Sequence, residues 1–590
     1  MKRIILFIAI IAFGIYVSAQ IPDAPKSMLS PNAAALGEYG DVPVSHFTGI
    51  PQIEIPLYTL QCGPHSLPIS LSYHAGGVRP DQHPGWAGLG WSLNAGGCVS
   101  RVVKDLPDEY SSNSLHDQRH LFNAGYLYSK GGLDGDEAYW ASDSNVSQLL
   151  TMPVNGNRYT AVAYDNEPDD FSFNFLDYHG KFFMGHDGVW KVQCNKPVKV
   201  IFNDEYIENP FEEVGANMNA RFMSEHYPSK LGYSHTIAQF IIIGEDGTKY
   251  YFGYDGNTSD SKNAIEYSIP FFQQNSADLI ANTWFLSKIE YTDNRTIALE
   301  YGSKYFVSQF YVSKYNVFFH SATIGGTPQG ISNSSNDFDN SSFNPDDIYS
   351  GMLIRPSYLL KISSNSDSVV FEKTVSNEKK YNMSEIMRNK SVPSSNIVDG
   401  SIDNTPQSKS NYFGALLNAL YGIWGTNGGG PYDYTAIKWY KLKNMNVFCG
   451  SDTIKSFTFN YNNDDSQQDL RLSLTSVLES SHGMTGRKHS FEYDSFELLP
   501  DYLSRQTDHW DFYNATTSFP PSNISGISEY TTCRAPNPSV ATYGTLSKIV
   551  YPTGGYTNFE YESHDYSFCY QSRSSIRSRN RPHASRRIKN

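Results

Sequence analysis

Residues 73–101 read YHAGGVRPDQHPGWAGLGWSLNAGGCVSR, and this stretch decides the fold expected for the rest of the chain. Short apolar pieces alternate with glycines at positions 76, 77, 85, 88, 90, 96 and 97. Glycine reaches backbone conformations that other residues avoid, so such clusters mark tight turns, bulges and close strand contacts. Trp86 and Trp91 would hold these turns against a core. The stretch, called the glycine corner below, predicts the point at which a β-rich shell begins.

Two strands are predicted to precede the glycine corner. Apolar residues alternate with other residues along both: Ile53, Ile55 and Leu57 in the first, and Leu67, Ile69, Leu71 and Tyr73 in the second. A period of two residues indicates a strand with one buried face. Gly63 and Pro64 lie between the two segments and favour a turn. The two segments therefore predict a β-hairpin.

Composition favours the same fold class. The 590 residues include 42 tyrosines, aromatic residues reach 14%, and charged residues only 18%. Aromatic side chains suit pleated, half-buried surfaces, and a chain of this length exceeds one compact core. We expect a mainly β protein of multiple antiparallel sheets and hairpin modules, a partial β-shell with few short helices. The six cysteines (Cys62, Cys98, Cys194, Cys449, Cys533 and Cys569) are too sparse for a disulfide scaffold.

Further hairpins are predicted after the corner. Phe171, Phe173 and Phe175 alternate, and turns are expected at His179-Gly180, at Asp187-Gly188 and at Asp246-Gly247. A weak internal repeat then places an apolar-x-x-apolar strand before an aromatic-acidic strand. Its four copies run through residues 286–301, 360–372, 474–493 and 546–561. A hairpin cannot bury its apolar face alone, so these units are expected to stack.

Three motifs follow one another within residues 29–110: GEYGDVPVSHFTGIPQIEIPLYTL, LPISLSYHAGGVRP and GWAGLGWSLNAGGCVSR. Two more are FEYD at 491–494 and IVYPTGGYTNFEYE at 549–562. Together they resemble the N-terminal region of large secreted bacterial RHS/YD-repeat proteins. TDHWDFYN at 507–514 also resembles a family segment, although Asp511 stands where glycine is expected. The resemblance implies an exported β-repeat protein, sometimes with a C-terminal toxin. No Asp-Pro dipeptide occurs, so the family's self-cleaving core is not visible.

The two ends of the chain differ from its body. Lys2 and Arg3, an apolar run and Ala19 predict a signal peptide at residues 1–19 and export to the extracellular space, cell surface or periplasm. Residues 415–424 are expected to form a short buried helix, and no transmembrane segment is expected in the mature chain. The basic segment 567–590 is expected to be disordered, either as an anion-binding tail or as a premature end of the chain.

Between these ends we expect three regions. Residues 20–110 form a glycine-rich β region, residues 111–283 form β-hairpins with polar loops, and residues 284–566 form irregular YD-like hairpin repeats with loop inserts. The formal net charge of −14 disfavours nucleic acid as a partner.

No motif assigns a catalytic, cofactor-binding or metal-binding residue. The nucleophile elbow, the phosphate loop, the dinucleotide fingerprint and the H-E-x-x-H zinc motif are absent. His83 near Asp81 suggests a dyad or metal pair, but a turn histidine hydrogen-bonded within the corner explains it more simply. The acidic runs at 134–137 and 165–170 lack the spacing of a calcium loop and are expected to be solvated. Carboxylate pairs for glycoside hydrolysis can lie far apart in sequence, so that chemistry stays open.

Three functions remain. The first is a non-enzymatic exported β-repeat scaffold, the N-terminal part of an RHS/YD-type protein, which acts in cell–cell interaction or encloses a downstream cargo or toxin. The second is a glycan-binding surface protein, since aromatic β surfaces stack on sugars. The third is a secreted hydrolase, which lacks a visible constellation of catalytic residues. Expected partners are a cargo polypeptide or a cell-surface protein or glycan, and no cofactor is expected.

Overall fold

The computed structural model describes the chain in segments. These are residues 42–45, 48–104, 107–109, 111–116, 119–124, 126–129, 162–164, 167–206, 237–254, 264–271, 280–302, 307–312, 323–324, 327–328, 349–379, 381, 439–462, 470–481, 484–504, 506–517, 533–563 and 586–588. Chain contacts separate Met1–Pro43 from Val44–Asn590, and every element named below lies in the second unit.

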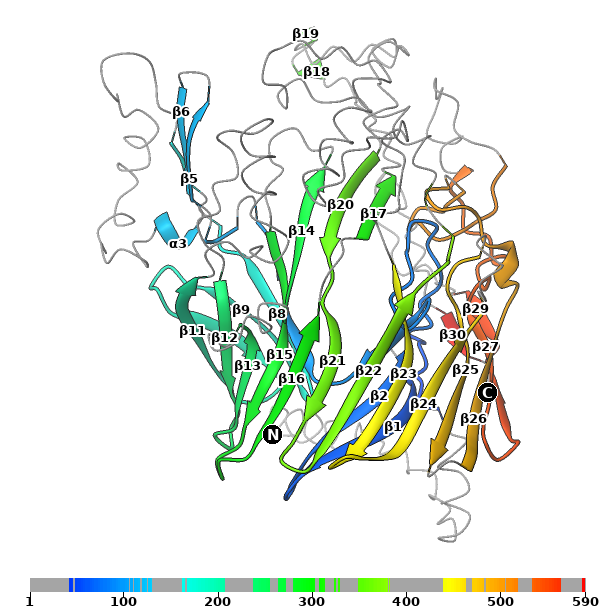
Figure 1. Ribbon diagram of the computed structural model, residues 1–590. Coiled ribbons are helices and arrows are strands. Elements are labelled where there is room, and N and C mark those ends of the chain that lie inside the picture. The colour runs from blue at the N-terminus through cyan, green and yellow to red at the C-terminus, as the bar shows by residue number, and fades with distance from the viewer. Residues whose placement is uncertain are drawn as a thin grey trace, which may run out of the picture. The chain divides into compact units, whose positions relative to one another are not determined.

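One long antiparallel sheet, called the main sheet, contains most of the predicted hairpins (Figure 1). Each strand pairs with the next in the order β11 (Lys199–Tyr206), β12 (Ile237–Ile243), β13 (Lys249–Gly253), β15 (Ile280–Glu290), β16 (Thr296–Gly302), β21 (Tyr358–Ser363), β22 (Asp367–Val375), β23 (Tyr440–Cys449), β24 (Asp452–Tyr461), β25 (Leu474–Ser481), β26 (Met484–Tyr493), β27 (Leu546–Val550) and β28 (Tyr556–Asn558). The prediction of a mainly β chain with large antiparallel sheets is confirmed.

A second antiparallel sheet shares β15 with the main sheet. Its order is β17 (Val307–Val312), β20 (Tyr349–Arg355), β14 (Ile265–Phe271), β15, β4 (Gly97–Val102), β8 (Asp170–Phe175), β9 (Tyr178–Met184) and β10 (Trp190–Cys194). The first half of β15 pairs with β4, and its second half pairs with β13. This long strand therefore passes from one sheet into the other.

Aromatic side chains fill the space where these two sheets meet. Trp284 of β15 and Phe240 of β12 lie 5.1 Å apart between ring centroids, and Phe240 lies 5.1 Å from Phe171 of β8. None of the three exposes measurable surface. Buried aromatic rings contribute large apolar areas, so this cluster is a major part of the core.

The predicted N-terminal hairpin is present as β1 (Ile53–Cys62) and β2 (His65–Tyr73), and β3 (Trp91–Asn94) pairs with β2. Leu67, Ile69, Leu71 and Tyr73 are all buried, as their alternation predicted. Gly63 has a φ of 66° and makes the turn between the strands. The period-two pattern thus identified both the strand and its buried face.

One predicted turn is wrong. The sequence placed a turn at His179-Gly180, whereas both residues lie inside β9 and the chain turns at Leu176-Asp177. Leu176 has a φ of 48° at this turn, a conformation that leucine rarely adopts. Gly180 is needed for another reason, because a Cβ at this position would lie 2.4 Å from the carbonyl oxygen of Gln193 in β10. The glycine permits close strand approach and does not mark a turn.

The other two turns are confirmed. Gly188 has a φ of 71° between β9 and β10, and Gly247 has a φ of 82° between β12 and β13. Asp-Gly pairs favour turns because glycine readily adopts such positive φ values.

Smaller elements complete the described chain. They are β5 (Ser111–His116), β6 (Arg119–Ala124), β7 (Val162–Tyr164), β18 (Thr323–Ile324), β19 (Thr327–Pro328), β29 (Tyr561–Ser563), β30 (Arg586–Ile588), the helix α3 (Tyr126–Ser129) and the 3-10 turn η6 (Phe496–Leu498). No helix among the described residues is long and apolar enough to cross a membrane.

Three expectations concern residues mostly outside the described segments. The predicted leader at 1–19 and the helix at 415–424 lie wholly outside them. Within the basic segment 567–590, Arg586–Ile588 forms β30 and pairs with β29, which differs from the disorder expected there. The remaining residues of this segment lie outside the description.

Candidate functional site

A recurring tyrosine hydrogen bond identifies the repeat unit. Tyr301 Oη donates to the carbonyl of Leu286 at 2.9 Å. Tyr493 Oη donates to the carbonyl of Leu474 at 2.6 Å, and Tyr561 Oη to that of Leu546 at 2.8 Å. In each unit the leucine lies on the first strand, and the tyrosine follows on the returning segment. Three of the four units found in the sequence thus share one structural bond, which the repeat pattern did not itself reveal.

The glycine corner crosses the ends of several units. The carbonyl of Trp86 accepts the N–H of Leu442 at 2.8 Å and the hydroxyl of Tyr461 at 3.2 Å. Leu89 N–H donates to the carbonyl of Leu472 at 2.8 Å. The corner therefore bonds to both the β23–β24 hairpin and the segment that enters β25.

The next two units receive side-chain bonds from the corner. Trp91 Nε1 donates to the hydroxyl of Tyr493 at 2.8 Å, and the N–H of Leu546 donates to the hydroxyl of Tyr73 at 3.0 Å. Trp91 is 3% exposed, as predicted, whereas Trp86 is only half-buried, with its ring 5.5 Å from that of Tyr358. Contacts across about 400 residues of sequence therefore join the corner to the main sheet.

Glycine is required at two positions of the corner, one beside the main sheet and one beside β2. Gly88 has a φ of 102°, and a Cβ there would lie 3.0 Å from the backbone nitrogen of Leu474. Gly90 has a φ of 78°, and a Cβ there would lie 2.5 Å from the ring of Tyr73. L-residues seldom adopt such φ values, and the tight space excludes side chains independently.

His83 lies buried beneath the corner with a carboxyl partner that the sequence did not suggest. Its Nδ1 donates to the carbonyl of Pro84 at 2.9 Å, and its Nε2 lies 3.9 Å from Glu378 Oε2. The rings of His83 and Trp439 stack with centroids 3.3 Å apart, and Tyr502 stacks at 5.3 Å. The turn-histidine interpretation agrees with the Pro84 bond, and the carboxyl group nearest to Nε2 is that of Glu378.

Burial keeps both members of this pair neutral near pH 7. It lowers the pKa of His83 to about 3 and raises the pKa of Glu378 to about 8. A base with so low a pKa binds a proton poorly at neutral pH. The pair is therefore an uncharged, buried contact between the corner and the segment that follows β22.

Arg471 secures the same region. Its guanidinium donates to the carbonyls of Pro80 at 2.9 Å, Gln82 at 3.0 Å and Pro500 at 3.0 Å, and lies 4.2 Å from the ring centroid of Tyr502. One arginine thus satisfies carbonyls of the corner and of the segment after β26. No sequence pattern pointed to this residue.

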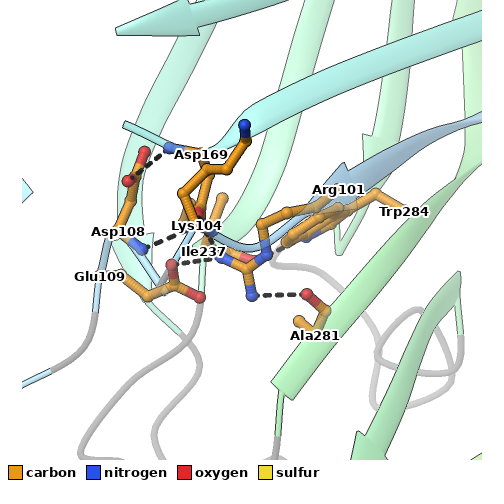
Figure 2. Close-up of polar contacts among 8 residues, drawn as sticks. All are labelled: Arg101, Lys104, Asp108, Glu109, Asp169, Ile237, Ala281 and Trp284. Carbon is orange, nitrogen blue, oxygen red and sulfur yellow. Dashed lines mark hydrogen bonds and ion pairs between the residues drawn. The ribbon is translucent and has the colours of Figure 1, made fainter. Parts of the chain in front are cut away.

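A second buried polar group, called the charge centre, contains Arg101, Asp108, Glu109 and Asp169 (Figure 2). Arg101 Nη1 lies 2.5 Å from Glu109 Oε2 and 3.5 Å from Asp169 Oδ2. Its Nη2 donates to the carbonyl of Ala281 at 2.5 Å, and its guanidinium carbon lies 5.1 Å from the ring centroid of Trp284. The arginine therefore ties β4 to β15 and to the acidic residues that follow β4.

The two aspartates of the charge centre bond reciprocally. Asp169 N–H donates to Asp108 Oδ1 at 2.9 Å, and Asp108 N–H donates to Asp169 Oδ2 at 3.0 Å. Lys104 N–H adds a bond to Asp169 Oδ1 at 2.8 Å. Burial raises the pKa of both aspartates. Each carboxyl satisfies backbone donors in the other segment, so the pair closes the connection between β4 and β8.

The acidic residues considered as calcium ligands do not form one described cluster. Asp169 belongs to the charge centre, and Glu167 and Asp170 lie 3.4 and 3.5 Å from Lys104 Nζ at the surface. Residues 134–137 lie outside the described segments. In the part of the chain that is described, no three histidine, cysteine or acidic side chains are grouped to hold a metal ion. The five cysteines with described positions carry free thiols.

The TDHWDFYN segment forms a tight turn. Asp508 Oδ1 accepts the N–H groups of Trp510 at 2.8 Å and Phe512 at 3.0 Å. Asp511 has a φ of 68°, which explains why glycine was expected there. Its carboxylate accepts a bond from Arg534 Nη2 at 2.9 Å. Asp511 thus forms an ion pair, whereas a glycine at this position would adopt the positive φ without strain.

Comparison with known proteins gives a loose structural likeness. No family model and no curated protein matches the chain. A crystal structure of TcdB2-TccC3 aligns with a TM-score of 0.30 at 10% identity over 77% of this chain and 17% of that one. The Photorhabdus luminescens Tc holotoxin pore gives 0.29 at 9% identity over 77% and 16%. The N-terminal domain of the effector SpvB from Salmonella typhimurium strain LT2 gives 0.25 at 11% identity over 72% and 99%.

These neighbours are toxin-related proteins, and the chain spans only about a sixth of the length of the Tc chains.

Proposed function

We propose that this chain is a non-enzymatic, exported β-scaffold of the RHS/YD type that shelters or presents a toxin-type cargo polypeptide. The observation that supports the proposal is the single construction rule of the main sheet: tyrosine-closed hairpin units, with the glycine corner bonded across successive units. Such units extend a sheet by adding one hairpin after another. The leader pattern of residues 1–19 supports export.

The buried polar groups also favour a structural role. The side chains of Arg101, Glu109, His83 and Glu378 are each 3% exposed or less, and their bonds join segments distant in sequence. A substrate would have to displace packed residues to reach them. Buried polar groups of this kind commonly lie against other polar groups that hold the fold together.

Glycan binding has less support. The large aromatic residues clearly exposed in the described segments are Phe183 on β9 and Tyr556 on β28, and these strands lie in different sheets. A sugar site usually needs several exposed rings together. The alternative is kept as an outcome of the test.

The test joins a protease-sensitive reporter polypeptide to the exported chain after residue 590. We expect the joined reporter to survive protease doses that digest the free reporter. Digestion at the rate of the free reporter would contradict a sheltering scaffold. A glycan array with residues 20–566 and a screen of generic glycoside, ester and peptide substrates run in parallel. Retained glycan, or turnover that depends on a single acid or serine, would favour the binding protein or the hydrolase instead.

A further inference from the structure

Successive hairpins of the main sheet join in one register. Tyr301 pairs with Leu359, Tyr461 with Leu474, and Tyr493 with Leu546. In each case the tyrosine that ends one hairpin lies opposite a leucine at or beside the start of the next strand. The junction is therefore a repeated, directional interface between units.

The last hairpin shows the same junction only in part. Tyr561 pairs with Ile588 of β30, so an apolar residue again lies opposite the terminal tyrosine. β30 ends there and covers only Tyr561–Ser563, whereas β27 continues along β26 as far as Ser490. Among the described strands, β28 pairs with β27 alone. The edge of β28 that faces away from β27 is called the free edge.

Hydrogen bonds show which backbone groups face the free edge. Tyr551 N–H donates to Gly555 O, and Phe559 N–H donates to Ser547 O, on the side of β27. Bonded pairs alternate along an antiparallel ladder, so Thr557 also faces β27 while Tyr556 and Asn558 present their backbone groups outward. Tyr556 is 62% exposed, and Asn558 is exposed as well. Such an edge is a template for another strand.

We infer that the free edge of β28 is a docking site for an apolar-x-x-apolar strand from a second polypeptide, namely another repeat unit of the kind this chain contains. This inference rests on the proposed scaffold function and names its partner. The repeated junction register specifies the occupant: its leading apolar residue takes the position that Ile588 holds opposite Tyr561, and its strand then continues past Asn558 to Tyr556. The incoming strand therefore replaces β30, which is too short to cover the edge.

A second copy of this chain paired through β28 fits less well. Two copies of a strand as short as Tyr556–Asn558 would share few backbone bonds. Stable dimers usually bury a much larger surface. A strand of another repeat unit, by contrast, covers the edge from Tyr556 to Ser563 and extends the face of the sheet.

The test measures binding of a cyclised, fluorescent hairpin peptide to the full exported chain. The peptide copies residues 440–461, in which Leu442 and Met445 have the apolar-x-x-apolar spacing of the repeat units. Asn558→Pro removes one outward N–H without touching the bonds to β27, and Asn558→Ala keeps that N–H as the matched control. We expect saturable binding to the wild type, roughly tenfold weaker binding to Asn558→Pro, and binding within about twofold to Asn558→Ala. A peptide carrying Leu442→Asp is expected to bind more weakly, because it disrupts the apolar pattern.

Equal binding by Asn558→Pro, or no binding by the wild type, would overturn the inference. Wild-type dimerisation that Asn558→Pro abolishes would assign the edge to a second copy and overturn the stated occupant. Tyr556→Pro removes the neighbouring outward N–H and replaces Asn558→Pro if circular dichroism shows that variant unfolded. Reporter protection is measured on the same samples, so loss of peptide binding with protection retained refutes this inference and leaves the scaffold function standing.

Discussion

Replacing Tyr493 by phenylalanine tests the link between the glycine corner and the repeat units. The hydroxyl of Tyr493 donates to Leu474 O at 2.6 Å and accepts from Trp91 Nε1 at 2.8 Å. The substitution keeps the ring and removes both bonds. A hydrogen bond contributes about 1 kcal/mol net, and an unsatisfied buried donor adds to the loss. We therefore expect the free energy of unfolding to fall by about 2–3 kcal/mol.

Two other tyrosines provide matched controls. Tyr301→Phe and Tyr561→Phe each remove one bond of the same kind, to Leu286 and Leu546 respectively. Each is expected to lower the unfolding free energy by about 1 kcal/mol. Urea unfolding is followed by far-ultraviolet circular dichroism and tryptophan fluorescence on the same samples.

A double-mutant cycle isolates the cross-sequence bond. Trp91→Phe removes the donor, and combining it with Tyr493→Phe gives the coupling energy between the two side chains. Residues in direct contact commonly show a coupling of about 0.5–3 kcal/mol. A coupling near zero, together with a Tyr493→Phe effect no larger than that of Tyr561→Phe, would refute the claim that the corner is bonded to this unit.

Three further predictions concern the corner, the tight turn and the buried acid. Gly88→Ala is expected to lower the unfolding free energy by roughly 1–3 kcal/mol, because Gly88 has a φ of 102° and close backbone neighbours. Gly85→Ala is the control, since a Cβ at Gly85 would meet nothing nearer than 4.0 Å, and it is expected to have little effect in the same urea titration. Asp511→Ala is expected to be about 1 kcal/mol less stable than Asp511→Gly, since both lose the ion pair but only alanine adopts an unfavourable φ of 68°; equal stabilities would contradict this. Burial raises the pKa of Glu378 from 4.5 to about 8, so the stability of the wild type relative to Glu378→Gln is expected to fall by roughly 1 kcal/mol per unit as the pH rises through this range, and a difference independent of pH from 5 to 8 would contradict the assignment.

Local sequence patterns predicted much of the fold. The alternation of Leu67, Ile69 and Leu71 identified a buried face because strand geometry repeats every two residues. Asp187-Gly188 marked a turn through a conformation that glycine favours. Gly180 wrongly predicted a turn, because glycine is also needed where β10 lies close to β9. A single sequence does not distinguish a glycine needed for close strand packing from one needed for a turn.

Contacts between segments that are distant in sequence could not be predicted from the sequence. The partners of His83 are Glu378 and Trp439, and Arg471 bonds to Pro80, although nothing in the intervening residues indicates these pairs. The pattern of residues 474–493 predicted a hairpin unit, but its tyrosine bond depends on strand register. Such pairings are specified by the assembled sheet and not by any local pattern.

The glycine corner is bonded to the main sheet, and hydrogen exchange can measure this attachment at single amides. The N–H groups of Leu89, Leu442 and Leu546 donate to Leu472 O, Trp86 O and Tyr73 Oη respectively. We expect these amides to exchange as slowly as the paired amides at the centres of β24 and β25, because all open in one cooperative unit. Fast exchange at these three amides, while β24 and β25 stay protected, would contradict the account.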